Sequence, residues 1–421
     1  MTYRDSKVSQ FSGFSFASLP VRPHVLFFIV YNALYFVPLF LVFFLGYYQS
    51  GVEEIVAISG TTMRRICLTY SAGIAAFTLG AYSPVFLHWS MRGYSLHAPH
   101  PRWLQTGVAE KIAVFILCIV FLASKLSLVP LGVYQDYAFD TGSMVGGPWT
   151  FSAFCSEAMI LAGIIFLFSK GKHRLLNFSI IGVLNGINLL HGTRVFFMST
   201  VMVLVLYGYV RGIVTFKRAM LYGPIVFALV LLLAYVVFLT RSHVDATGAF
   251  SAPAVVSPIV YESVFSQMSL IGVVGPNRVW DSFGHPLRFV LDVFLFTMPR
   301  QLLPEKESFL FIGRFNYLSP LGAFNGYAQG IIYFGFLFPF FYFFVGLMGS
   351  LLYKKSHQSP WWLVLYIFYS ADFLLHIMRD GYLIPMKMLI NTAECILILI
   401  VWRNLLSACA PQRATAIPEP S

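Results

Sequence analysis

Long apolar runs separated by short polar connections repeat along the chain. Ten of these runs approach the roughly 20 residues that an α-helix needs to cross a bilayer. The runs lie at about residues 24–48, 66–89, 112–131, 150–169, 175–191, 195–213, 221–240, 326–353, 361–378 and 382–402. The pattern predicts an all-α polytopic membrane protein, a single transmembrane domain over residues 1–421 with about ten membrane-spanning helices.

Composition supports this prediction. Of the 421 residues, 58% are hydrophobic and 11% are charged, whereas soluble globular proteins carry about a quarter of their residues as charged. So few charges do not cover a water-facing surface, and the main solvent of the chain is therefore expected to be lipid. The run at 24–48 lacks a small-residue cleavage site, so we expect it to be retained as the first span.

Basic residues in the short connections predict the orientation of the spans, because lysine and arginine concentrate on the cytoplasmic side. With the N-terminus inside, every short cytoplasmic connection is basic, whereas the connection at 132–149 has neither lysine nor arginine. The chain is therefore expected to be N-in and C-in, with a disordered cytoplasmic tail over 404–421. The net charge of +11 is mostly this bias, so no nucleic-acid partner is expected.

One external connection is much longer than the others. Residues 241–325 form a loop of about 85 residues, and loops of this length are usually functional. Within it, residues 286–299 are an apolar stretch between prolines, too short to span a bilayer, which favours a helix lying at the membrane interface. Residues 260–274 are expected to form a second helix of this kind.

Arginines occur on the external side, against the usual bias. Arg194 lies in the short turn between the fifth and sixth spans, and Arg379 lies in the last external turn. The long loop adds Arg241, Arg278, Arg288, Arg300, Arg314 and the single lysine Lys306. The planar guanidinium fork binds phosphate and carboxylate in a bidentate manner. Arginines around one external cavity would therefore suit an anionic ligand such as a pyrophosphate.

The alternative is that these arginines anchor the interface or pair with loop carboxylates. For Arg241, Arg278 and Arg288 we favour this structural role. Arg194 and Arg379 lie in tight turns with few acidic neighbours, so for them we favour ligand binding. The loop carboxylates are Asp281, Asp292, Glu305 and Glu307.

Ionisable residues also occur within the predicted spans, where they are costly and are functional candidates. In the ninth span, Asp372, His376 and Arg379 follow i, i+4, i+7 spacing and so share one helix face. Asp372 and Lys387 are expected at similar depth, which predicts a buried ion pair. His376 would alternatively accept a proton from a substrate hydroxyl, and His191 is a weaker candidate for that role.

Several catalytic signatures are absent from the sequence. It has no phosphate-binding glycine-rich loop with lysine, no Asp-x-Asp pair on an external loop and no His/Asp cluster with metal-ligand spacing. We therefore expect neither a metal nor another cofactor. A reaction would need a leaving group that is already activated, as in a lipid-linked sugar pyrophosphate.

Four segments resemble those of one family, the Wzy-type oligosaccharide repeat-unit polymerases or O-antigen polymerase family. Residues 296–309 (FTMPRQLLPEKESF) resemble its proline–basic–hydrophobic–proline–x–lysine segment in the large external loop. Residues 192–209 (GTRVFFMSTVMVLVLYGY) resemble its small-residue–arginine turn, and 378–390 (MRDGYLIPMKMLI) its arginine-bearing turn between the last two long spans. Residues 329–348 (QGIIYFGFLFPFFYFFVGLM) resemble its glutamate–x–tyrosine–x–asparagine–phenylalanine–glycine entry into a span. The resemblance covers roughly 185–402.

Two positions depart from the family pattern. Gln329 stands where many members have glutamate, and Tyr333 stands where they have asparagine. If that glutamate is a catalytic base in the family, Gln329 does not replace it here, which shifts weight towards His376.

The resemblance implies a GT-C-like helical fold shared with lipid-sugar glycosyltransferases, and a metal-independent glycosyltransferase in a bacterial inner membrane. It would transfer the growing glycan from undecaprenyl pyrophosphate to the terminal sugar of an incoming lipid-linked repeat unit at the periplasmic face, in O-antigen or exopolysaccharide synthesis. It also implies a polysaccharide chain-length regulator as a partner. The expected catalytic residues are Arg194, Arg300, Arg379 and His376. The expected substrate-binding residues are Arg314, Lys306, Gln329 and His191.

Two alternative functions stay open. An O-antigen ligase of the same superfamily would use the same donor with a lipid A core acceptor. A lipid-glycan flippase or an ion-coupled transporter would instead rely on Asp372, Lys387 and Glu394 within the spans. Against a transporter, the sequence has no repeated halves and no Gly/Pro-broken helices in matching positions.

Overall fold

The protein is described by a computed structural model. It describes residues 22–45, 58–83, 115–119, 149–168, 173–190, 194–210, 221, 232, 252–275, 284–298, 302–303, 305–318, 324–356 and 360–409.

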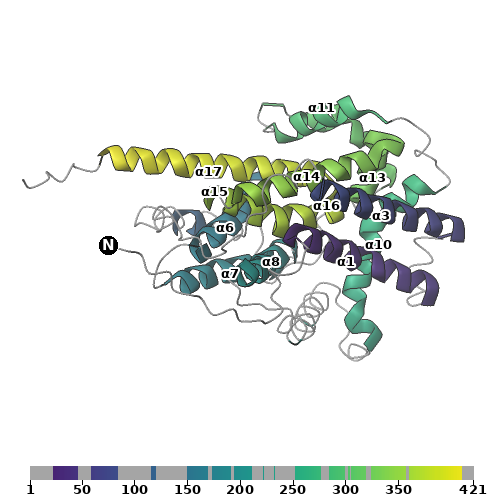
Figure 1. Ribbon diagram of the computed structural model, residues 1–421, viewed down its shortest axis with the longest axis horizontal. Helices are drawn as coiled ribbons and strands as arrows, with labels where there is room; N and C mark the ends of the chain where they lie inside the picture. Colours follow the sequence, from purple (N-terminus) through teal and green to yellow (C-terminus); the bar gives the residue numbers. More distant parts are fainter. Residues whose placement is uncertain are drawn as a thin grey trace, which may run out of the picture.

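Every regular element in these ranges is helical (Figure 1). The longer helices are α1 (Pro23–Leu45), α3 (Gly60–Ala81), α6 (Trp149–Phe168), α7 (Arg174–Leu190), α8 (Arg194–Val210), α10 (Ala252–Val274), α14 (Phe338–Ser356) and α17 (Leu383–Cys409). The shorter helices are α11 (Pro286–Thr297), α12 (Lys306–Phe309), α13 (Gly326–Phe334), α15 (Pro360–Phe368) and α16 (Leu374–Asp380). Short 3₁₀ or π-helical segments are η6 (Phe311–Leu318), η7 (Gly335–Leu337) and η8 (Tyr369–Phe373).

The prediction of an all-helical chain is confirmed for the described residues. Four of their helical stretches are long and apolar enough to cross a membrane, which supports a multi-pass membrane protein. These stretches are Pro23–Phe44, Gly326–Ser356, Trp361–Asp380 and Leu383–Trp402. Shorter apolar helices at Glu157–Phe168, Arg174–Ile187 and Phe196–Gly208 coincide with three further predicted spans. The spans predicted at 112–131 and 221–240 lie almost entirely outside the described residues.

The second span was predicted at 66–89, but α3 begins earlier, at Gly60. Ser59 caps this helix, because its Oγ accepts a hydrogen bond from the backbone N–H of Thr62 at 3.2 Å. Arg65 precedes the apolar run, and its Nη1 donates to the carbonyl oxygen of Val274, the last residue of α10, at 2.9 Å. The apolar run therefore locates the hydrophobic part of the helix, whereas the capping residue determines where the helix begins.

The long loop predicted at 241–325 places a helix inside the bundle. Helix α10 crosses α1 (Figure 1), and most side chains over 263–275 are buried. Ser263 Oγ donates to a backbone carbonyl of α1, and Gln267 Nε2 donates to the hydroxyl of Tyr70 on α3 at 2.5 Å. The helix expected over 260–274 is therefore present, and its described part is buried among other helices. Its polar side chains lower its hydropathy, but they find partners and so permit burial.

The helix expected over 286–299 is present as α11, on the periphery of the bundle (Figure 1). Its outward face is apolar, since Leu287 is 87% exposed. Its buried Asp292 accepts from the backbone N–H groups of Phe311 and Ile312 at 3.0 and 3.1 Å, and from the Tyr333 hydroxyl at 2.5 Å. Asp292 thus connects α11 to η6 and α13 through hydrogen bonds. It does not form an ion pair with the exposed Arg288.

The last helix is longer than its apolar span. Helix α17 continues to Cys409, so it runs into the segment 404–421 that was expected to be a disordered tail. Residues after 409 lie outside the described part.

Candidate functional site

A π-helical turn interrupts the helix that contains the predicted ninth span. Helices α15 and α16 are joined through η8, and such π-helical turns are rare and frequent at functional sites. Asp372 lies in this turn and is fully buried. The carbonyl oxygen of Ala371 accepts from the Tyr31 hydroxyl of α1 at 2.9 Å. A neighbouring helix therefore satisfies a backbone group within the turn and holds it in place.

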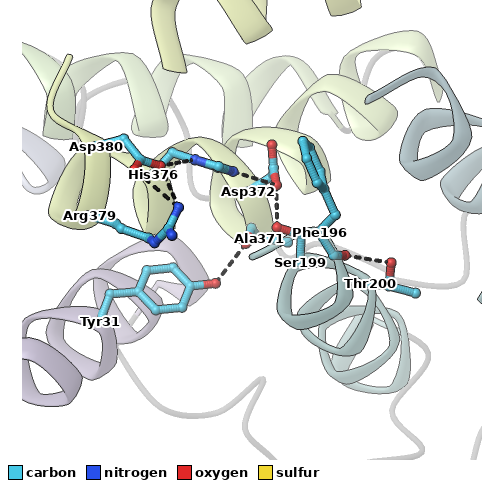
Figure 2. Close-up of polar contacts among 9 residues, drawn as sticks. All are labelled: Tyr31, Phe196, Ser199, Thr200, Ala371, Asp372, His376, Arg379 and Asp380. Atoms are coloured by element: carbon cyan, nitrogen blue, oxygen red, sulfur yellow. Dashed lines mark hydrogen bonds and ion pairs between the residues drawn. The ribbon is translucent and has the colours of Figure 1, made fainter. Parts of the chain in front are cut away.

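Four ionisable side chains follow one another from this turn to the end of α16 (Figure 2). His376 Nε2 lies 3.6 Å from Asp372 Oδ1, and His376 Nδ1 lies 2.6 Å from Asp380 Oδ2. Arg379 Nη1 donates to Asp380 Oδ1 at 3.1 Å. We call Asp372, His376, Arg379 and Asp380 the His376 row.

The shared helix face predicted from the sequence is confirmed for Asp372 and His376. Spacing of four residues stacks Asp372, His376 and Asp380 one above the other. Arg379 joins the row through Asp380, its neighbour in the chain, and not through His376. The row thus has a carboxylate on each side of one imidazole, with a guanidinium at its outer end.

Helix α8 lies beside the row and contributes a hydroxyl group to it. Ser199 Oγ donates to Asp372 Oδ1. The rings of Phe196 and His376 lie 6.0 Å apart, measured between centroids (Figure 2). Lower residue numbers on α8 therefore meet higher numbers on α16, and the two helices run antiparallel.

This register locates the start of α8. Arg194 is its first residue, two residues before Phe196, so its backbone lies near the level of the end of α16, where Arg379 is found. The side chain of Arg194 is outside the described residues. Arg194 and Arg379, both expected in turns, thus belong to chain segments at the same end of the α8–α16 pair.

The turn after α16 is fixed by polar side chains at the start of α13. Gln329 Oε1 accepts from the backbone N–H of Tyr382 at 2.6 Å, and Asn325 Nδ2 donates to the carbonyl oxygen of Met378 at 3.1 Å. Gly381 has a φ of 77°, and a Cβ there would overlap the Gln329 amide. Gln329, expected to bind substrate, is buried and holds the backbone beside Arg379. Its role in binding stays a prediction.

The ion pair predicted between Asp372 and Lys387 is not formed. Lys387 Nζ lies 5.5 Å from the ring centre of Phe296 on α11, a cation–π contact. Asp372 instead binds Ser199, because it projects from the π-helical turn towards α8 (Figure 2). Similar depth along two helices did not bring the two side chains to the same side.

The other predicted residues are described only in part. Arg314 is exposed on η6, with its guanidinium carbon 5.8 Å from the ring centre of Phe311. Within the described residues, no hydrogen bond or ion pair joins it to the His376 row. Lys306 begins α12, but its side chain is not described, and Arg300 and His191 lie outside the described residues altogether.

One polar residue of the row and two beside it were not singled out from the sequence. Asp380 lies four residues after His376, so the spacing that revealed Asp372 also pointed to it. Ser199 gave no signal, because hydroxyl residues are common in membrane helices. Glu157 is buried on α6 and accepts from Asn391 Nδ2 of α17 at 3.0 Å. A carboxylate in the apolar run at 150–169 was a visible signal.

The row is chemically suited to holding a proton beside an arginine. An imidazole between two carboxylates exchanges protons readily, because each ring nitrogen faces an acceptor. Arg379 supplies a permanent positive charge at the outer end, where it neutralises Asp380. Comparisons with protein-family models, with curated proteins and with solved structures find no match to this chain.

Proposed function

We propose that this protein polymerises lipid-linked oligosaccharide repeat units at the periplasmic face of a bacterial inner membrane. It would transfer the growing glycan from undecaprenyl pyrophosphate to the terminal sugar of an incoming repeat unit. The observation that supports this proposal is that positively charged arginines and a row of groups able to accept a proton occur at the same helix end. Arg379 and the backbone at the start of α8, which begins with Arg194, lie where the His376 row ends.

Glycosyl transfer from a pyrophosphate needs both kinds of group. Arg379 and Arg194, joined by Arg300 of the long loop, would bind the donor pyrophosphate and stabilise the negative charge that develops as it leaves. The row would take the proton of the attacking sugar hydroxyl. No metal is required for this chemistry, because guanidinium groups replace the cation that neutralises a leaving pyrophosphate.

The chain offers a matched set of variants to test this proposal. Arg194→Ala, Arg300→Ala and Arg379→Ala would be expressed in a polymerase-deficient strain and the glycan run on a gel. Removing one preorganised charge donor typically slows catalysis by about 10²–10³-fold, so each ladder should collapse to a single repeat unit. Arg288→Ala is the control, because Arg288 is an exposed arginine of the same loop with an expected anchoring role.

Each outcome separates the proposal from its alternatives. Unchanged protein level with loss of the ladder supports donor-binding arginines in a polymerase. Full-length polymer left unattached to lipid A in a strain that lacks only this protein would identify a ligase. Wild-type ladders from all three variants would overturn the pyrophosphate site.

A proton-coupled carrier is the second candidate, and the His376 row favours it specifically. Titratable groups extend from the fully buried Asp372 to the partly exposed Arg379, as a proton path would. Proteoliposomes would separate the two functions: a carrier acidifies its lumen when substrate is added, whereas a polymerase lengthens glycan without net proton movement.

A further inference from the structure

The members of the His376 row differ in their access to solvent. The Asp372 side chain is 0% exposed, and the exposed fraction rises through 5% for His376 and 9% for Asp380 to 29% for Arg379. The order along the row is therefore also an order from interior to surface. A substrate arriving at the end of α16 meets the Arg379–Asp380 pair first.

His376 is poorly placed to contact a substrate hydroxyl itself. Its Nδ1 is engaged with Asp380, 2.6 Å away. Its Nε2 is buried without a hydrogen-bond partner and faces Asp372 on the interior side. Neither nitrogen points to the surface, so a sugar would have to pass Asp380 to reach the ring.

We propose that the Asp380 carboxylate accepts the proton of the acceptor hydroxyl, and that His376 acts through Asp380 as a positioning residue. This inference rests on the proposed polymerase function and reassigns the proton acceptor within it. Asp380 lies at the end of α16, bonded on one side to His376 and on the other to Arg379. The same arginine that binds the leaving pyrophosphate would thus hold the base beside it.

The transfer step then balances within the groups named. The hydroxyl oxygen of the incoming repeat unit forms a bond to the anomeric carbon of the growing glycan. The bond between that carbon and the pyrophosphate oxygen breaks, and undecaprenyl pyrophosphate leaves with the electron pair. The hydroxyl proton passes to Asp380. His376 keeps Nδ1–H on Asp380 Oδ2, while its Nε2 faces the buried Asp372, 3.6 Å away.

The first test concerns Asp380. Purified full-length protein in liposomes would be given lipid-linked repeat units extracted from a polymerase-deficient strain, and chain growth measured. Loss of a general base typically costs about 10²–10⁴-fold, so Asp380→Ala and the isosteric Asp380→Asn should both lose at least about 100-fold. Added formate, a small carboxylate, should raise the rate of Asp380→Ala, while leaving Asp380→Asn unchanged because its amide fills the space.

The second test concerns His376. Asparagine places an N–H where Nδ1 stands, whereas glutamine extends its amide towards the Nε2 position. A positioning role through Nδ1 predicts that His376→Asn retains at least about ten times the rate of His376→Gln, with the affinity for undecaprenyl pyrophosphate unchanged in both. If the two variants lose activity equally and imidazole restores His376→Gly, then His376 is the base and the proposal is overturned.

The wild-type result separates this inference from the proposed function. A folded wild-type protein that forms no chains from these units overturns the polymerase function itself. An active wild type with an active Asp380→Ala variant overturns only the role of Asp380.

Discussion

Two arginines at helix ends have contrasting surroundings. Arg22 precedes α1, and its Nη1 donates to the carbonyl oxygen of Ala81 at 2.7 Å and to Ser350 Oγ at 2.6 Å. Its guanidinium also lies over the ring of Tyr82, and the residue as a whole is 8% exposed. Arg379, by contrast, bonds to a carboxylate and exposes 29% of its side chain.

The difference separates a structural arginine from a candidate ligand-binding one. Arg22 connects the start of α1 to the end of α3 and to Ser350 within α14. Its acceptors are neutral groups of the protein itself, so these bonds are permanent parts of the fold. Arg379 is paired with Asp380, whose charge an arriving anion can replace at the surface. Both are arginines at helix ends, so the residue type alone does not distinguish them. Burial and the chemistry of the partner do.

The largest expected effect comes from Arg379. Arg379→Ala should lower the rate of glycan transfer by about 10²–10³-fold, while the midpoint of thermal unfolding in detergent falls less than for Arg22→Ala, because Asp380 keeps its hydrogen bond to His376. Transfer rate per folded molecule and thermal unfolding would both be measured. If Arg379→Ala lowered the folded yield but left the transfer rate per folded molecule unchanged, Arg379 would be the structural arginine of the two.

Arg22→Ala should show the opposite pattern. Loss of buried hydrogen bonds from a charged group typically costs about 2–3 kcal/mol, so the folded yield should fall. The activity of the molecules that do fold should be unchanged, because Arg22 connects α1 to α3 and α14 and is not part of the His376 row. Fluorescence-detected size exclusion, combined with the transfer assay, checks both halves. Loss of activity at normal folded yield would contradict the structural role.

The smallest expected effect concerns the turn beside Arg379. Gly381→Ala introduces a side chain at φ 77°, where the strain is on the order of 1–3 kcal/mol, and pushes its Cβ into the Gln329 amide. Stability and transfer rate should fall together, because the turn that holds Arg379 moves. Gly182→Ala is a matched control, since a Cβ there meets nothing within 4 Å. Equal behaviour of the two variants would show that the turn is not constrained.

Much of this architecture was predictable from the sequence, and the reasons for the misses are physical. Apolar runs located α1, α14 and α17, because burial in lipid demands long uninterrupted stretches. Helix α10 was predicted as an interfacial helix and not as a buried one, because its serines and Gln267 lower its hydropathy, although Ser263 and Gln267 donate to groups on α1 and α3. A hydropathy pattern does not reveal hydrogen-bond partners that are distant in the sequence.

The candidate site was predictable only along one helix. Spacing by four residues revealed Asp372 and His376, and it would have revealed Asp380 as well. The π-helical turn and the contact with Ser199 depend on how α8 and α16 pack, which no local pattern encodes. The same packing is why the ion pair expected between Asp372 and Lys387 is absent.

The central claim is that the end of α16 carries out glycosyl transfer from a lipid pyrophosphate. The most direct test is reconstituted wild-type and Arg379→Ala protein in liposomes with undecaprenyl pyrophosphate-linked repeat units, with glycan length and released undecaprenyl pyrophosphate measured together. The account predicts that the wild type lengthens the glycan and releases one lipid pyrophosphate per repeat unit added, and that Arg379→Ala does neither. Folded wild-type protein that leaves glycan length unchanged would contradict it.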